Sequence, residues 1–233
     1  MTDPLESDEN GDAAVVVRSF AHPELFAELY HRYAADIHRF CGRRLGDGAA
    51  DDVTTETFLT AFRTRRRFDT DRASARSWLY GISAELIDRQ RRTEVQALEA
   101  LAASGYDPVA ESRADRALRA PLAAALAGLS TGDRHAVLLV GWADLGDQDV
   151  AEALGIDVVA VRNRLARARR TLRAALGYDD VLPGGSYVEE IHVLRSFRAD
   201  ASRPDRARLA PGRRRLLDRA AAARGPRRML GRA

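Results

Sequence analysis

A short apolar-patterned segment, a glycine and a longer basic segment follow one another between residues 146 and 176, and this order limits the fold more than any other feature. Val150, Ala151 and Leu154 have the spacing of the buried face of a short helix. Gly155 can end that helix, since glycine takes the left-handed conformation at little cost, and Asp157 can cap the next one. The pattern predicts a helix-turn-helix. The residues expected to pack inward from its second helix are Val161, Leu165, Ala168 and Leu172.

Apolar residues recur at helical spacing through much of the remaining chain, and no segment of useful length alternates as a strand does. The clearest stripe runs from Phe26 to Cys41, and others follow at Val53 to Phe62 and at Trp78 to Leu86. We therefore expect an all-α protein of two small helical domains joined by a flexible linker. The expected division is an acidic tail at 1–20, a first domain at 21–95, a linker at 96–112, a helix-turn-helix domain at 113–178 and a basic extension at 179–233.

Cysteine usage and the N-terminal sequence indicate the cellular compartment of the protein. Cys41 is the only cysteine, so a disulfide within the chain is excluded, as befits a reducing cytosol. His31 and His38 share its helix, but a fourth zinc ligand is missing, and we expect neither a metal nor another cofactor. The first twelve residues are acidic and polar, unlike a signal peptide, and no run of about 18 apolar residues is present. We expect a cytoplasmic protein without membrane insertion.

The second helix of the predicted helix-turn-helix is rich in arginine. If its apolar face packs inward, Arg162, Asn163 and Ala166 point away from the core, and Arg164 and Arg167 lie on the flanks. Arginine can read guanine through two hydrogen bonds, and asparagine can read adenine in the same way. A solvated basic helix would have a similar composition, but the glycine turn and the small Ala151 favour a DNA-reading helix.

Two features of the first domain admit more than one interpretation. Asp51, Asp52 and Glu56 lie on one helix beside its apolar face. Paired acids can act in acid–base catalysis, but no histidine or metal-ligand set is nearby in the sequence, and a solvated acidic face or a docking surface for a basic partner fits equally well. In the next helix, Trp78 and Tyr80 are interleaved with arginines, which is typical of single-strand binding, although Trp78 also fits a core position.

Several stretches in a fixed order resemble the extracytoplasmic-function (ECF) sigma factors of bacterial RNA polymerase. Each is moderately specific alone, but their order and spacing are strongly specific, and the resemblance covers roughly half of the chain. The matching residues are Ala50 to Leu59, Ser77 to Ile82, Arg91 and Arg92, Leu129, Arg134, Val150 to Ile156 and Val161 to Arg169.

The resemblance implies that the chain binds core RNA polymerase and directs promoter recognition and transcription initiation. Its first domain would correspond to sigma region 2 and its second to sigma region 4. The residues implied for polymerase binding are Asp51, Asp52, Glu56 and Phe58. Those implied for the minus-ten element are Arg76, Trp78, Tyr80, Glu85, Arg89, Arg91 and Arg92. Those implied for the minus-thirty-five element are Val158, Arg162, Asn163, Arg164, Ala166, Arg167 and Arg170.

The sequence departs from the family pattern at a few positions. Glu85 stands where family members usually carry asparagine, Asp149 stands where glutamate is usual, and Val159 with Ala160 replaces a common Gly-Thr pair. These changes leave the promoter sequence open. Many members are held inactive by an anti-sigma factor, often at the membrane, and no residue here shows whether this chain has such a partner.

Two other classes of function compete with this interpretation. A self-sufficient helix-turn-helix regulator would bind duplex DNA without polymerase, but the sequence shows no ligand pocket or phosphoacceptor domain. An enzyme would need a catalytic constellation, and the sequence contains no phosphate-binding loop, nucleophile elbow or metal motif. We therefore expect a protein that is not an enzyme.

The C-terminal extension lies beyond the minimal plan of the family. Residues 183–233 contain 13 arginines and five acidic residues, a net charge of +8, whereas the whole chain carries +3. Amphipathic helices are predicted at 187–197 and 206–223. Two interpretations stay open: a partly disordered basic tail, or a regulatory extension that contacts the polymerase, DNA or the two domains.

Overall fold

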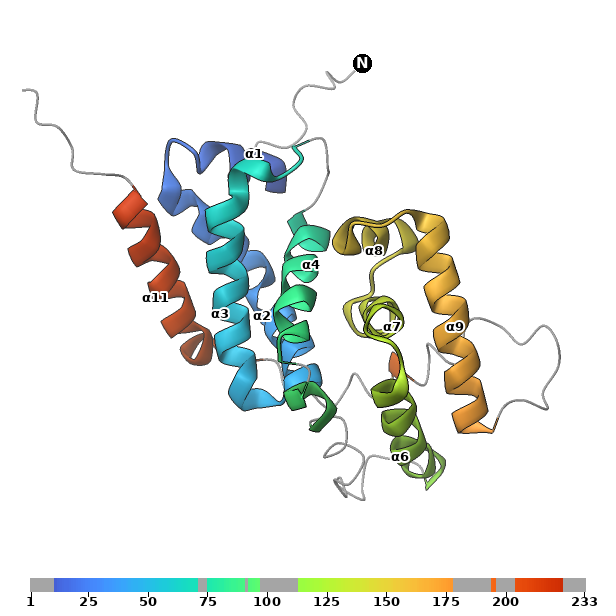
Figure 1. Cartoon of the computed structure of the whole chain (residues 1–233). Coiled ribbons are helices and arrows are strands. Elements are labelled where there is room, and N and C mark those ends of the chain that lie inside the picture. The colour runs from blue at the N-terminus through green and yellow to red at the C-terminus, as the bar shows by residue number, and fades with distance from the viewer. Residues whose placement is uncertain are drawn as a thin grey trace, which may run out of the picture.

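The computed structural model describes residues 11–70, 75–90, 92–96, 113–177, 194–195 and 204–223, and every regular element in these ranges is helical (Figure 1). The all-α prediction is confirmed. Over the same ranges, none of the helices has the length and apolar character needed to cross a membrane. The elements are α1 (Asp12–Arg18), η1 (Pro23–Phe26), α2 (Ala27–Leu45), α3 (Asp47–Thr64), η2 (Arg65–Arg67), α4 (Ala75–Asp88), α6 (Arg113–Gly128), α7 (Thr131–Ala143), α8 (Asp147–Leu154), α9 (Val158–Leu176) and α11 (Arg206–Ala223).

Helices α2, α3 and α4 form the first bundle, and its core consists of the predicted apolar stripes. Phe26, Ile37, Phe58 and Leu79 are completely buried. The ring of Phe26 meets that of Phe62 edge-on, with 5.5 Å between the centroids. Each side chain of this size contributes about 1.5–3 kcal/mol on full burial, so these residues add substantially to the stability of the bundle.

Helix α1 differs from the sequence-based expectation. Residues 11–20 were expected to belong to a loose acidic tail, but Val15 and Val16 of α1 are buried in the first bundle. Asp12 is buried with them, and its carboxylate accepts hydrogen bonds from Arg32 Nη1 at 3.0 Å and from the Ala75 backbone nitrogen at 2.6 Å. The second bond satisfies a free N–H group at the start of α4, so α1 stabilises the start of that helix.

Helices α6 to α9 form the second bundle and contain the predicted helix-turn-helix. Gly155 ends α8 in the left-handed conformation with φ of 62°. The Asp157 carboxylate accepts a hydrogen bond from the Ala160 backbone nitrogen at 2.7 Å and so caps α9. The inward-facing residues are those predicted: Val161, Leu165, Ala168 and Leu172 are all buried.

The two bundles pack against each other, chiefly through α4 and α8 (Figure 1). Gly81 makes this close approach possible, because a Cβ atom at this position would lie 2.2 Å from the carbonyl oxygen of Ala153. Ser77 Oγ donates to the Asp149 carboxylate at 3.2 Å, and the Arg76 guanidinium donates to the Ala143 carbonyl. One face of α4 is therefore covered by the second domain.

Substituting Gly81 by alanine should open this interface while leaving both bundles helical. The added methyl group meets backbone, which cannot rotate away, so the helices have to separate. Small-angle scattering should show a larger radius of gyration with an unchanged far-ultraviolet circular dichroism spectrum. Gly48→Ala is the matched control, since a Cβ atom there meets nothing within 4 Å. A scattering profile identical to that of the wild type would contradict the packing.

A buried ionic cluster also joins the two bundles. Arg44 on α2, Glu94 in the helical turn at 92–96 and Arg134 on α7 are all fully buried. Glu94 Oε1 accepts from Arg44 Nε at 2.7 Å, and Glu94 Oε2 lies 3.3 Å from Arg134 Nε. Burial, together with the charges of Arg44 and Arg134, lowers the pKa of the neighbouring His135 to about 3, so its imidazole is neutral at pH 7. Glu94 offsets the charge of two arginines from different domains.

Parts of the C-terminal extension belong to the folded body. The helix predicted at 206–223 is confirmed as α11, which runs alongside α3 on the side away from α4 (Figure 1). Leu216 and Ala220 are buried there. Of the helix predicted at 187–197, only 194–195 are described, and there Leu194 is buried and its carbonyl accepts from Trp142 Nε1 at 3.0 Å. Nearly all of the predicted linker at 96–112 lies outside the described residues.

Candidate functional site

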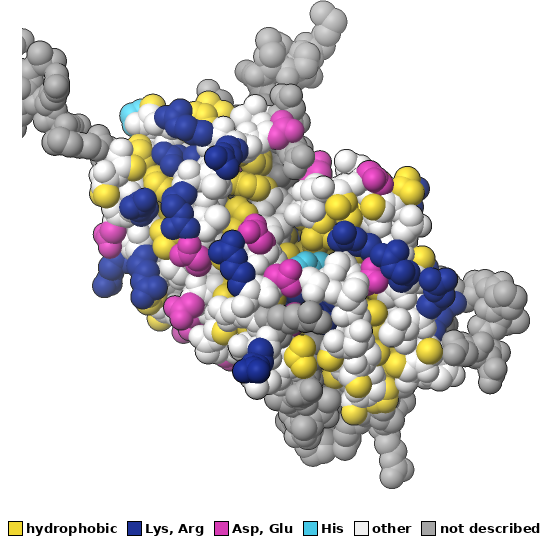
Figure 2. Space-filling model, viewed as in Figure 1, with side chains coloured by type: hydrophobic (Ala, Val, Ile, Leu, Met, Phe, Trp, Pro, Cys, Tyr) yellow, Lys and Arg dark blue, Asp and Glu magenta, His cyan; other side chains and the backbone are white. Residues whose placement is uncertain are grey.

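The outer face of α9 carries most of the side chains predicted to read DNA. Figure 2 shows a band of basic side chains on the α9 side of the molecule. Of the predicted residues, five are exposed and two, Val158 and Arg164, are half-buried. Because they share one face of a helix whose opposite face is buried, they can approach a groove of DNA together. The exposed residues are Arg162, Asn163, Ala166, Arg167 and Arg170.

Acidic residues of the second bundle hold two of these arginines in place. The Asp133 carboxylate accepts two hydrogen bonds from Arg167, at 2.7 and 3.1 Å. Burial would raise the pKa of Asp133, but the hydrogen bonds from Arg167 and Ser130 outweigh burial and hold this pKa below its usual value. Arg162 Nε lies 3.2 Å from Asp147 Oδ2, and the Arg162 side chain stays 69% exposed. Arg162 can therefore exchange its contact with Asp147 for one with DNA, whereas Arg167 would first have to break two hydrogen bonds to Asp133.

The acidic helix α3 presents Asp51, Asp52 and Glu56 on one side of the first bundle. Asp52 is exposed, and Asp51 and Glu56 are half-buried. Glu56 pairs with the Arg63 guanidinium two turns further along. Phe58, predicted with them, is fully buried, and its ring centroid lies 4.7 Å from that of Tyr30. In this arrangement Phe58 supports the helix from inside and has no exposed surface for a partner.

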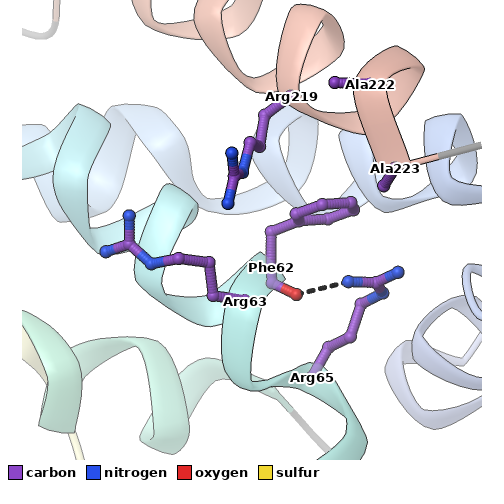
Figure 3. A pocket seen from close by; sticks show the side chains of 6 residues that line it. All are labelled: Phe62, Arg63, Arg65, Arg219, Ala222 and Ala223. Atoms are coloured by element: carbon purple, nitrogen blue, oxygen red, sulfur yellow. Dashed lines mark hydrogen bonds between the residues drawn. The ribbon is translucent and has the colours of Figure 1, made fainter. Parts of the chain in front are cut away.

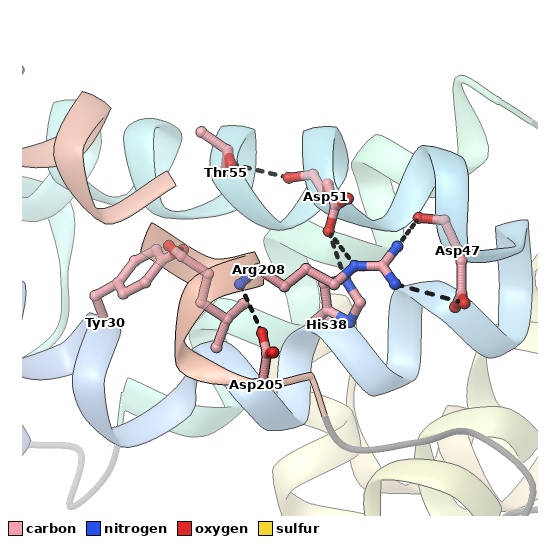
Figure 4. A network of polar contacts seen from close by, with 8 residues as sticks. Tyr30, His38, Asp47, Asp51, Thr55, Asp205 and Arg208 are labelled. Carbon is pink, nitrogen blue, oxygen red and sulfur yellow. Dashed lines mark hydrogen bonds and ion pairs between the residues drawn. The ribbon is translucent and has the colours of Figure 1, made fainter. Parts of the chain in front are cut away.

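Asp51 is the centre of a polar network between three helices (Figure 4). Its Oδ1 lies 2.7 Å from His38 Nε2 on α2 and accepts a hydrogen bond from Arg208 Nε on α11 at 2.9 Å. Burial would raise the pKa of Asp51, but Arg208 and His38 outweigh burial and hold this pKa below its usual value. The carboxylate is therefore ionised and already engaged within the chain.

The predicted aromatic residues of α4 differ in exposure. Trp78 is half-buried and packs on Phe68, with 5.0 Å between ring centroids. Tyr80 is only 2% exposed and meets Phe40 edge-on at 5.2 Å. Burial raises the pKa of Tyr80 to about 12. The Tyr80 ring therefore offers no free face of the kind that stacking on a base requires, and in this arrangement it is a core residue.

The charged residues predicted on and after α4 are more accessible. Glu85 and Arg89 are exposed and form an ion pair of 2.9 Å. Arg92 is exposed as well, and Arg91 lies outside the described residues. Arg76 is half-buried because it contacts the second bundle. The structure therefore brings Glu85, Arg89 and Arg92 to one end of α4 and Arg76 to the other.

A basic hollow that sequence reasoning missed lies where α3 and α11 end (Figure 3). Arg65 donates to the Phe62 carbonyl at 2.6 Å, and its guanidinium lies 3.9 Å from the centre of the Phe62 ring. The hollow is lined by Phe62, Arg63, Arg65, Arg219, Ala222 and Ala223. The arginines at 63 and 65–67 are plain in the sequence, but their juxtaposition with Arg219 needs the fold.

The histidines and the cysteine have separate surroundings. His31 Nε2 lies 2.9 Å from Arg213 Nε, whereas His38 faces Asp51. Cys41 is buried, and burial raises its pKa to about 12. In the part of the chain that the structure describes, three or more His, Cys, Asp or Glu side chains nowhere gather in a way that could hold a metal ion.

Comparisons with known proteins match both bundles. The sigma-70 region 2 family matches residues 29–95, and the sigma-70 region 4 family matches residues 119–172. The ECF RNA polymerase sigma factor SigC of Mycobacterium tuberculosis is 33% identical over 159 residues, which span 63% of this chain and 80% of that protein. The ECF RNA polymerase sigma factor SigM of the same species is 31% identical over 175 residues, which span 73% of this chain and 87% of that protein.

A solved structure has a similar fold. CnrH in complex with the cytosolic domain of CnrY has a TM-score of 0.50 and 26% identity, and the match covers 72% of this chain and 99% of that one.

Proposed function

Because this chain belongs to the ECF RNA polymerase sigma factors, which bind core polymerase, recognise promoters and direct transcription initiation, we propose a role in these steps for each of its surfaces. The observation that carries the proposal is the exposed basic face of α9, mounted on a capped helix-turn-helix. The polymerase supplies the chemistry of RNA synthesis, and the sigma factor acts by binding. The protein acts in the cytoplasm, where polymerase and DNA are found.

The α9 face reads the minus-thirty-five element as duplex DNA. Arg162 and Asn163 lie near the N-terminal end of α9 and point to solvent, which is the part of a recognition helix that reaches base edges in the major groove. Arg164, Arg167 and Arg170 then contact phosphates on either side. Val158 and Ala166 provide apolar contact surface in the same face, of the kind that suits thymine methyl groups.

Replacing Arg162 by alanine should weaken promoter binding by about 1–3 kcal/mol if this residue reads a base. The loss should be confined to duplexes with the preferred base at one position of the element. Binding of holoenzyme to the preferred duplex and to its single-base variants measures this effect. An equal loss on every duplex would show that Arg162 contacts only phosphate.

The first domain supplies the other two surfaces. Asp51, Asp52 and Glu56 on α3 form the docking surface for core polymerase, and they offer carboxylates to basic groups of the partner. The α4 end with Arg89 and Arg92, together with Arg91, holds the unpaired minus-ten strand, and Glu85 influences which base is accepted. Phe58 and Tyr80 serve by supporting these helices.

Promoter binding needs a more open arrangement than the one described. Arg76 and Ser77 of α4 contact the second domain, so separation of the domains would expose this face of α4. The two promoter elements lie apart on DNA, and a linker between the domains allows both to be reached. An anti-sigma factor, if this chain has one, would act by favouring the closed arrangement.

A further inference from the structure

Helix α11 lies directly on the acidic face of α3. Its buried side is made of small and aliphatic residues, Gly212, Leu216 and Ala220, which let it approach closely. A Cβ atom at position 212 would lie 2.5 Å from Tyr30 Oη and 2.7 Å from Thr55 Oγ1. The Tyr30 hydroxyl donates to the Leu209 carbonyl of α11 at 2.9 Å. These contacts fix both the position and the depth of α11 on the first bundle.

Two arginines of α11 pair with carboxylates of α3, and Figure 4 shows the first of them, Arg208, beside Asp47 and Asp51. Besides its bond to Asp51, Arg208 donates to the Asp47 backbone carbonyl at 2.8 Å, and its Nη1 lies 3.6 Å from the Asp47 carboxylate. Arg215 Nη1 lies 3.9 Å from Asp52 Oδ1. Exposed ion pairs contribute little to stability, but they set the position of α11 along α3 and match its charge to that surface.

We propose that α11 is an internal competitor of core polymerase, which occupies the docking surface of α3 and has to leave before the polymerase can bind. The proposal rests on the proposed function, because it takes Asp51 and Asp52 to be polymerase contacts. Two of the three acidic docking residues are engaged by α11, so both ligands cannot hold them at once. The chain thereby regulates its own recruitment.

The competition has a measurable consequence for affinity. A ligand that binds only the open form has its affinity reduced by the fraction of molecules that are open. If α11 is bound in at least about 90% of the molecules, its release raises the affinity for core polymerase by about tenfold or more. The effect lies in the population of open molecules and leaves the docking contacts themselves unchanged.

The test compares full-length variants in titrations of labelled protein with core polymerase. Arg208→Glu with Arg215→Glu removes the ion pairs, and Gly212→Leu separates the helices by steric clash. Both should bind core polymerase about tenfold or more tightly than the wild type. Arg206→Glu with Arg214→Glu is the control, since both side chains are exposed on the same helix and the charge change is identical; its affinity should stay that of the wild type.

A peptide of residues 204–223, added in trans to the Arg208→Glu/Arg215→Glu variant, should restore the weaker polymerase binding, and a peptide with both substitutions should not. Equal affinity of all variants, or weaker binding by the released ones, would overturn the competition while leaving the sigma role intact. If neither the wild type nor any released variant binds core polymerase, the proposed function itself fails.

Discussion

Replacement of Glu94 by glutamine should lower the free energy of unfolding by about 3–5 kcal/mol, the usual cost of removing one partner from a buried ion pair. The glutamine has nearly the same shape but no charge. Arg44 and Arg134 are both fully buried, and without Glu94 two positive charges would face each other across the domain interface. Burial already lowers the pKa of Arg44, and the charge and hydrogen bond of Glu94 oppose this shift most strongly.

Urea denaturation followed by circular dichroism measures this loss. Glu85→Gln is the matched control, because Glu85 forms an ion pair with Arg89 in which both side chains are about 70% exposed; its loss should cost less than about 1 kcal/mol. If the two variants were equally stable, the buried cluster would contribute no more than a surface pair, and this account of how the domains are joined would be wrong.

Reversing the charge of Asp52 and Glu56 together should reduce the affinity for core polymerase at least 100-fold, or about 2.7 kcal/mol. Asp52 is 82% exposed and Glu56 is 44% exposed, so arginine at these positions fits without disturbing the core, and repulsion replaces attraction at the partner. The loss should exceed any gain from the weaker hold on α11, since α11 keeps its contacts with Asp51.

Binding to core polymerase, measured by size-exclusion chromatography and by titration, tests this expectation. Glu24→Arg with Glu28→Arg changes the net charge equally on another part of the first bundle and should leave the affinity unchanged. Unaltered binding by the Asp52 and Glu56 variant, with its helix content intact, would remove α3 from the docking surface.

Local sequence patterns were sufficient for the helices and for the helix-turn-helix. Apolar spacing predicted the buried faces of α2, α3 and α9, and Gly155 and Asp157 were predicted as the residues that end α8 and cap α9. These features depend on residues a few positions apart, where helix geometry fixes which side chains meet. The exposed face of α9 follows from the same argument.

Contacts between distant residues could not be read in this way. Glu94 and Arg134 look like ordinary solvated charges until the fold brings them together with Arg44. The acidic sequence around Asp12 suggested a loose tail, since nothing local shows that its carboxylate is buried beside α4. Tyr80 was assigned to a surface on composition, but its position on α4 directs it to Phe40.

The contacts of the C-terminal extension could not be predicted from the sequence either. Its helix at 206–223 was predictable from amphipathic spacing, and its charge was plain in the sequence. Its partner was not, because Arg208 and Asp51 are 157 positions apart. Only the fold shows that the basic extension and the acidic helix α3 are complementary.

Run-off transcription on a fragmented genomic library tests the sigma role of this chain, with core polymerase from a GC-rich bacterium and either the wild-type chain or its Arg208→Glu/Arg215→Glu variant. We expect discrete new start sites that depend on the added protein and share both promoter elements, with higher yield from the variant. An absence of new starts with both proteins, together with tight binding to duplex DNA without polymerase, would contradict the sigma role and identify a stand-alone regulator.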